Sequence, residues 1–317
     1  MCKRNLVGDL LRVANHTLAA HPSSIHSLAY STARHSCKPQ PHRGFETLTA
    51  TMEGLTDHAD SLGNAGRYGH GDLQWMTAGK GIVHGEMFPL INMDKPNPLR
   101  LFQIWLNLPR ASKMSPPSFV MHWHERIPTV TGADDLTTIT VWAGTLEGIS
   151  GLPPPPNSYA TRPESEVAVW LLNMQRGASY ELPAAEGGDA VNRAVYFVEG
   201  DSVSIAGQAF DGQTRVDVSA AVPTTVTNTG AAAATVLLLQ GRPIGEPVVQ
   251  HGPFVMSSQA EIEQAFADYR ATRFGGWPWP EDAVIFPADK GRFALVDGVE
   301  SFPPAAVGER VAGKDEL

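Results

Sequence analysis

The chain has 317 residues, of which 42% are hydrophobic and 18% charged, so it is long enough for two globular domains. Its formal net charge of −9 comes without any basic block, which argues against direct binding to nucleic acid or anionic lipid. No run of about 18 apolar residues occurs, so no membrane span is expected. The 30 Gly and 25 Pro residues favour short strands and turns over long helices.

The first 37 residues form an atypical segment. They are rich in Ser and His, and their charged residues are mainly basic. A transit peptide, a mis-assigned start and an altered exon would each explain this composition, and the three alternatives stay open. A secretory signal peptide is not expected, because no apolar run of about seven residues follows Lys3 and Arg4.

Two further features bear on the cellular compartment. Cys2 and Cys37 have neither metal-site nor redox spacing, which favours a reducing compartment, cytoplasmic or nuclear. Residues 314–317 read Lys-Asp-Glu-Leu, which has the form of an ER-retrieval address. Because no signal peptide is visible, a charged tail over residues 301–317 is the preferred interpretation.

Two pairs of polar residues, each two positions apart, bracket the stretch from residue 40 to residue 86. Gln40 and His42 form the first pair, and His84 and Glu86 form the second. Residues i and i+2 of a strand share a face, so neighbouring strands would bring these four side chains together in the lumen of an antiparallel barrel. Two imidazoles and one carboxylate are the ligands of a non-haem Fe(II) site, and they also suit Mn, Ni, Cu or Zn. The alternative, two half-buried histidines and a surface carboxylate, is less consistent with the matched spacing.

Residues 99–108 alternate in polarity and predict a further barrel strand. Gln103 on this strand is expected either to line the metal cavity or to be a satisfied core amide, and both alternatives stay open. His122 and His124 form another i, i+2 pair, but they lie beside a Pro-containing loop, and surface positions are expected for both.

A weak internal repeat marks a second unit that begins near Glu166. Residues 195–200 (VYFVEG) echo residues 49–54 (TATMEG), and each run is followed by a Gly-containing turn. The alignment places Glu186, Gly188, Gly230 and Ala232 at the positions of the four candidate ligands. The second unit is therefore expected to share the fold and to lack the metal ligands.

One amphipathic helix is predicted near the end of the chain. Ser258 to Glu261 has the form of a capping box, and apolar residues follow at helical spacing. The aromatic segment from Phe274 to Pro280 is expected to be a corner packed against the second barrel.

The stretch around the candidate ligands resembles the N-terminal cupin domain of the pirin family. The matching residues are Pro41 to Thr47, Glu53-Gly54, Asp60 to Asn64, Gly71 to Gly79, Gly81-Ile82, His84 and Glu86-Met87. Further similarity appears at Gly245 to Pro247, Gly252 to Met256 and Phe274 to Pro278, so that the resemblance covers about residues 38–300.

This resemblance implies an all-β fold of two antiparallel cupin (jelly-roll) barrels in tandem, to which the predicted C-terminal helix is added. The expected domains are an N-terminal, metal-binding cupin over residues 38–150 and a C-terminal cupin without metal ligands over residues 160–300. In the family, three His and one Glu hold one iron. Carried onto this sequence, the ligands are His42, His84 and Glu86, with Gln40 where the family has His.

The resemblance further implies a metal-dependent dioxygenase that acts on a small molecule of the flavonol (quercetin) type. One divalent metal, Fe(II) before Mn, Ni, Cu or Zn, is expected in a monomeric protein, with Glu86 as the catalytic residue. Gln40 is a weak, neutral donor, so it either bonds a metal-bound water or leaves the site poor in metal. Two alternatives follow: a metal- or redox-responsive module that binds a regulatory protein, and a metal-free structural bicupin.

Overall fold

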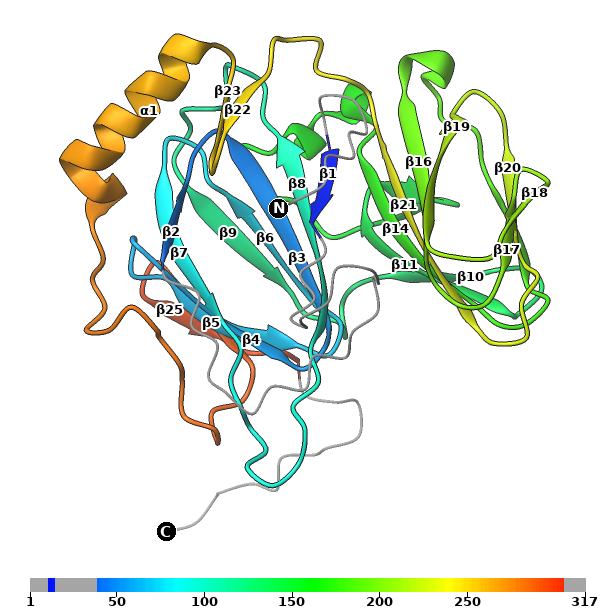
Figure 1. Cartoon of the computed structure of the whole chain (residues 1–317), viewed down its shortest axis with the longest axis horizontal. Helices are drawn as coiled ribbons and strands as arrows, with labels where there is room; N and C mark the ends of the chain where they lie inside the picture. The colour runs from blue at the N-terminus through cyan, green and yellow to red at the C-terminus, as the bar shows by residue number, and fades with distance from the viewer. Residues whose placement is uncertain (1–10, 15–38, 305–317) are drawn as a thin grey trace.

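The computed structural model describes residues 11–14 and 39–304, which form two antiparallel β-barrels lying side by side (Figure 1). Helix α1 (Gln259–Thr272) lies on the outer flank of the first barrel, on the left of the figure. The predicted all-β fold of two tandem cupin barrels with one C-terminal helix is thus confirmed. In the part of the chain that the structure describes, no helix is long and apolar enough to cross a membrane.

Two sheets form the first barrel, with strand orders β1-β8-β3-β6-β9 and β2-β7-β4-β5-β24-β25. The first sheet contains β1 (Leu11–Ala14), β3 (Phe45–Glu53), β6 (Asp72–Thr77), β8 (Arg100–Asn107) and β9 (Ser118–His122). The second contains β2 (Gln40–His42), β4 (Leu55–Asp60), β5 (Ala65–Gly69), β7 (Ile82–Met87), β24 (Phe293–Val296) and β25 (Val299–Ser301).

The second barrel also has two sheets, with strand orders β10-β11-β14-β21-β16-β19 and β15-β20-β17-β18. The first of these contains β10 (Thr129–Thr131), β11 (Thr137–Ala143), β14 (Ala168–Met174), β16 (Asn192–Glu199), β19 (Thr214–Ser219) and β21 (Ala234–Gly241). The other contains β15 (Ser179–Leu182), β17 (Val203–Ile205), β18 (Gln208–Phe210) and β20 (Thr224–Asn228).

Short elements connect the barrels and their strands. Two hairpins are formed by β12 (Thr145–Leu146) with β13 (Ile149–Ser150) and by β22 (Val249–His251) with β23 (Phe254–Met256). The 3-10 turns are η2 (Tyr159–Thr161), η3 (Pro163–Ser165), η4 (Gly188–Ala190) and η5 (Arg273–Gly275).

The two barrels differ in what fills them. On β14, Leu171 joins the apolar contact between the barrels, and its neighbour Leu172 points into an apolar second lumen. On β3, Leu48 joins the same contact between the barrels, but Thr49 points the other way and donates a hydrogen bond to Glu86. Alternation along each strand therefore gives the first barrel a polar interior and the second an apolar one.

The internal repeat corresponds to equivalent strands, β3 and β16. Each strand has a register shift just before its last residue, Glu53 or Glu199. Gly54 and Gly200 follow with φ values of 78° and 125°, which glycine adopts readily. The two barrels thus bend and turn at matching points.

Strand pairing divides the chain differently from the boundaries expected at residues 38–150 and 160–300. β10 and β11 lie before residue 150 but belong to a sheet of the second barrel, whereas β24 lies before residue 300 but pairs with β5 of the first. β1, inside the segment expected to be atypical, pairs with β8. Strand pairing does not follow the expected boundaries, because the sheet that a strand joins depends on long-range register, which local sequence does not reveal. Residues 15–38 and the tail from residue 305, with its Lys-Asp-Glu-Leu end, lie outside the described residues.

The predicted helix is capped as its sequence indicates. The Ser258 side chain accepts from the Glu261 amide at 3.3 Å, and the Glu261 carboxylate accepts from the Ser257 amide at 2.8 Å. The aromatic segment after the helix packs on the first barrel, so its expected place against the second barrel was wrong. Trp279 Nε1 donates to the Asp60 carbonyl at 2.8 Å, because β24 must return to the first sheet and carries this segment with it.

Candidate metal centre

Strand register brings the four predicted side chains to one lumen. On paired strands β2 and β7, Gln40 lies opposite His84, and Glu86 follows two residues later on the same face. The ring centroids of His42 and His84 are 4.8 Å apart. The histidine pair and Glu86 are buried, whereas Gln40 is exposed at the rim. The lumen therefore contains His42, His84 and Glu86, with Gln40 above them.

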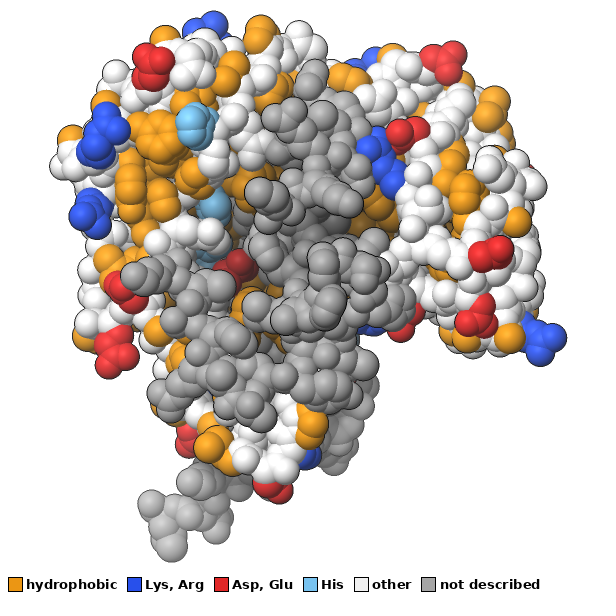
Figure 2. Space-filling view, viewed as in Figure 1, with side chains coloured by type: hydrophobic (Ala, Val, Ile, Leu, Met, Phe, Trp, Pro, Cys, Tyr) orange, Lys and Arg blue, Asp and Glu red, His pale blue; other side chains and the backbone are white. Residues whose placement is uncertain are grey.

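Figure 2 shows histidine side chains on this face of the first barrel's lobe, beside hydrophobic side chains. Outside the grey residues, Lys, Arg, Asp and Glu side chains are scattered over this face. The Gln40 amide nitrogen is 3.5 Å from His84 Nε2, so the amide contacts the imidazole from the rim.

Three donors hold the Glu86 carboxylate. Its Oε1 accepts from Thr49 Oγ1 at 3.1 Å and from the Tyr68 hydroxyl at 3.0 Å, while Oε2 accepts from Gln103 Nε2 at 2.8 Å. Of the two alternatives left open for Gln103, the structure therefore supports a place in the cavity. Burial, and then the charge of Glu86, raise the pKa of Tyr68 far above its usual range. The phenol consequently remains a neutral hydrogen-bond donor.

The buried histidines are held in their neutral form. Burial, and then the neighbouring His84, lower the pKa of His42 to about 3. Burial also lowers the pKa of His84 to about 3. Neutral imidazole is the form that binds metal ions, so protonation does not compete with a metal here at neutral pH.

His58, which the sequence analysis missed, faces the same lumen from β4. It lies directly opposite Glu86 on paired strands, and its ring centroid is 5.5 Å from that of His84. Its Nε2 is 3.4 Å from Asp60 Oδ2, and neither side chain is exposed. The i, i+2 spacing of His58 and Asp60 is the same signal that identified the two predicted pairs, and it lies between them in the sequence.

The donor types of the lumen fit a divalent first-row metal ion. His42, His58 and His84 each have a buried Nδ1 without a hydrogen-bond partner, an unusual condition for a buried polar atom. Neutral nitrogen and carboxylate oxygen are ligands that such ions accept. Elsewhere in the described chain, one group of three side chains has its possible ligand atoms all within 4.8 Å of one another. The ligand atoms of His42, His84 and Glu86 are farther apart than this. Binding an ion would therefore draw the lumen donors closer together.

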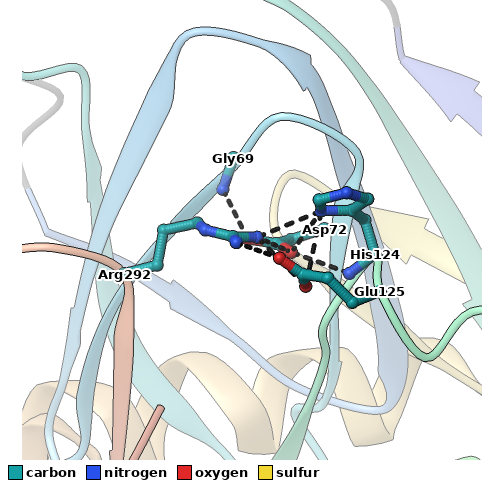
Figure 3. A network of polar contacts seen from close by, with 5 residues as sticks. All are labelled: Gly69, Asp72, His124, Glu125 and Arg292. Carbon is teal, nitrogen blue, oxygen red and sulfur yellow. Dashed lines mark hydrogen bonds and ion pairs between the residues drawn. The ribbon is translucent and has the colours of Figure 1, made fainter. Parts of the chain in front are cut away.

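That tighter group consists of Asp72, His124 and Glu125, and it already contains a cation (Figure 3). Arg292 Nη1 donates to Asp72 Oδ1 at 2.7 Å, and its other terminal nitrogen pairs with Glu125. A guanidinium among these carboxylates neutralises the charge that would attract a metal ion. The cluster is better explained as an ion-pair network that fastens the segment before β24 to the first barrel.

His122 and His124 were both expected at the surface, and the structure places only one of them there. His124 has a half-exposed side chain, as expected for a surface residue. His122 is buried, and the surface expectation was wrong for it. Its Nε2 lies 3.0 Å from the Pro153 carbonyl, because the proline-rich loop between the barrels folds over this end of β9.

The second barrel has a different interior. Its lumen is filled by an apolar cluster that includes Trp170, Leu172, Phe197 and Leu238. The positions aligned with the four candidate ligands, Glu186, Gly188, Gly230 and Ala232, offer one carboxylate and no imidazole. Chemistry that needs a polar cavity is thus confined to the first barrel.

Two cupin barrels in one chain, one with a polar lumen and one without, define the molecule as a bicupin. The family model described as Pirin matches residues 13–106, and that of the Pirin C-terminal cupin domain matches residues 169–275. The chain belongs to the pirin family. Because the match begins at residue 13, the expectation that the first 37 residues fall outside the family was wrong in part.

Several relatives agree with this assignment. A pirin-like protein of Caulobacter vibrioides is 38% identical over 234 residues, which cover 74% of this chain and 79% of the relative. Pirin of Mus musculus is 34% identical over 240 residues, 74% of this chain and 76% of the relative. A crystal structure of quercetin 2,3-dioxygenase from Acinetobacter baumannii superimposes with a TM-score of 0.69 at 28% identity, covering 79% of this chain and 83% of that one.

Proposed function

We propose that this protein is a metal-dependent dioxygenase acting on small molecules of the flavonol (quercetin) type. The observation that carries the proposal is the buried lumen in which neutral His42 and His84 lie beside the Glu86 carboxylate. The similarity to the Acinetobacter baumannii quercetin 2,3-dioxygenase supports the same class of reaction. Fe(II) is the proposed ion, and the donor types also suit Mn, Ni, Cu or Zn.

The residues of the lumen would have different roles in the reaction. Bound by His42, His84 and Glu86, the metal supplies the redox chemistry and the open positions that a reaction between dioxygen and an enol requires. Glu86 is the carboxylate available to accept the proton of a substrate hydroxyl. Tyr68 keeps its own proton and holds Glu86 in place, because its pKa lies far above its usual range.

An aromatic wall beside the histidines favours a flat, aromatic substrate. The ring centroids of Phe45 and Trp105 are 4.3 Å apart, and those of Phe45 and His42 are 5.1 Å apart. Trp105 is partly exposed, so its indole face is available for stacking. A polyphenol ring against this wall would keep water away from the reacting atoms.

Oxygen uptake after anaerobic Fe(II) loading and desalting tests the proposal. We expect the native chain to retain about one iron, as a mononuclear site requires, and to consume oxygen with quercetin. Glu86→Gln keeps the shape of the side chain and should abolish uptake, whereas the matched change Glu125→Gln, in the Arg292 cluster, should leave uptake unchanged.

The other outcomes identify the two alternative functions. Iron retention without oxygen uptake on any flavonol would refute the enzyme and favour a metal-responsive module that binds a regulatory protein. No retained metal under any loading condition would favour a structural bicupin.

A further inference from the structure

We propose that His58 supplies the third imidazole of the metal centre, in place of the family histidine that Gln40 replaces in this chain. The inference rests on the proposed function, since it names the ligands of the same centre. The imidazole of His58 is buried beside that of His84, and it comes from β4, a strand that contributes no predicted ligand.

The position of His58 in the barrel suits a ligand. It lies opposite Glu86 on the adjacent strand, so the two side chains leave the sheet on the same face. His58 is fully buried, as His84 is, whereas Gln40 is exposed at the rim. A ligand in the lumen is shielded from water, and a rim amide is not.

The hydrogen bonds of His58 determine which nitrogen is free. Its Nε2 faces Asp60 Oδ2 at 3.4 Å, and the other Asp60 oxygen accepts from the amides of Leu62 and Asn64 at 2.8 and 3.0 Å. This carboxylate is therefore fixed, and because a carboxylate can only accept, we assign the imidazole proton to Nε2. The lone pair then lies on Nδ1, which is buried and has no partner. A carboxylate that orients an imidazole in this way is the usual support of a metal-bound histidine.

Ring separations are consistent with one shared ion. Two imidazoles bound at about 2.1 Å place their ring centroids roughly 4.5–6.5 Å apart, depending on the angle at the metal. His84 lies 4.8 Å from His42 and 5.5 Å from His58 by this measure, so these two pairs fall within the range. His84 thus lies beside both of the other rings, and a shared ion would draw His42 and His58 to within the same range of each other.

Gln40 is the weaker candidate on chemical grounds. Its amide nitrogen, and not its oxygen, is the atom placed 3.5 Å from His84 Nε2, and an amide nitrogen has no lone pair to offer a metal. Turned over, the amide would present a neutral oxygen, which first-row metal ions bind less well than imidazole.

Metal affinity and a count of bound imidazoles test the proposal. The variants are His58→Ala, Gln40→Ala and Asp60→Asn, with His122→Ala as the matched control, because His122 is also buried and also has an unpartnered Nδ1. Fe(II) retention after anaerobic loading gives the affinity. Electron-spin-echo modulation of the Cu(II)-loaded chains gives the number of bound imidazoles, and thermal unfolding shows that each variant is folded.

We expect His58→Ala to weaken metal binding by at least about tenfold and to reduce the imidazole count from three to two. Asp60→Asn should weaken binding less, and Gln40→Ala and His122→Ala should change it by less than about twofold. If His58→Ala does not fold, the same two measurements are made on His58→Gln.

Two results would overturn the proposal, and they differ in what else they affect. If His58→Ala binds as the native chain does while Gln40→Ala loses metal, His58 is not a ligand and the proposed function stands. If the native chain retains no metal at all, the proposed function fails together with this inference.

Discussion

Arg67 and Asp57 form a two-pronged ion pair in the wall of the first barrel. Arg67 Nε and Nη2 donate to the two Asp57 oxygens at 2.6 and 2.8 Å, and neither side chain is exposed. The same guanidinium donates to the carbonyls of Phe286, Pro287 and Lys290 at 2.6–2.8 Å. One side chain thus fixes the segment that leads into β24.

Replacing Arg67 should therefore be costly. Arg67→Met keeps much of the volume but leaves Asp57 as a buried, unpaired charge, and we expect a loss of about 3–5 kcal/mol in the free energy of unfolding. Urea denaturation measures it. Arg100→Met, which removes a half-exposed pair with Glu199, should cost about 0–1 kcal/mol. Similar losses in both variants would contradict this account.

Gly44, just after His42, should tolerate a side chain far less well than Gly63 does. Their φ values, 84° and 83°, are equally unfavourable for alanine. A Cβ on Gly44 would lie 2.0 Å from the Val255 carbonyl oxygen, whereas one on Gly63 would meet nothing within 4 Å. We expect Gly63→Ala to cost about 1–2 kcal/mol and Gly44→Ala about 1–3 kcal/mol more. Thermal unfolding of the two variants gives the difference, and equal costs would show that β23 moves aside freely.

Glu46 should make stability depend on pH. Burial raises its pKa from 4.5 to about 7, although Thr77 and Ser158 donate to it at 2.5 and 2.6 Å. The folded state therefore favours the protonated acid. The resulting stabilisation is fully present below pH 4.5 and is lost as the pH rises to about 7.

Glu46→Gln isolates this contribution. At about 1.4 kcal/mol per pKa unit, the native chain should lose about 3 kcal/mol, relative to the variant, between those two pH values. The quantity to compare is the free energy of unfolding of the native chain minus that of the variant, at each pH. This difference is needed because the lowered pKa values of His42 and His84 change stability in the opposite direction below pH 6.5, and they do so in both chains. Parallel stability curves for the two chains would rule out the raised pKa.

Tyr68→Phe should weaken metal binding without removing a ligand. The change deletes the hydroxyl that donates to Glu86 at 3.0 Å, so the carboxylate loses part of its orientation. We expect metal affinity to fall about tenfold. Tyr180→Phe is the matched control, because it deletes a hydroxyl that donates to Glu147 at 2.7 Å in the second barrel. Metal titration of both variants decides, and equal affinities would mean that Tyr68 does not support the site.

Local patterns predicted the parts of the fold that local chemistry determines. The i, i+2 spacing of His84 and Glu86 placed both on one face of a strand, and the Ser258 capping box placed the start of the helix. His58 has the same spacing to Asp60, but only the register of β4 with β7 reveals that it faces Glu86. Register is a long-range property, and one sequence contains little information about it.

The same limit explains the misplaced segments. Nothing near Phe293 in the sequence indicates that it pairs with Arg67, more than two hundred residues earlier. The expected place of the aromatic segment on the second barrel was wrong for the same reason, because the strands that it contacts lie far away in the sequence. His122 was placed at the surface because the loop that covers it follows about thirty residues later.

The pairing of β24 with β5 also sets an order of assembly. All strands of the second barrel lie between Thr129 and Gly241, so that barrel can form while the ribosome is still making the rest of the chain. The first barrel must keep the edge of β5 open until Phe293 has been synthesised. An open edge attracts other strands, and closing it over so long a separation is slow. The barrel that carries the candidate metal centre is thus begun first and completed last, on a neighbour that is already folded.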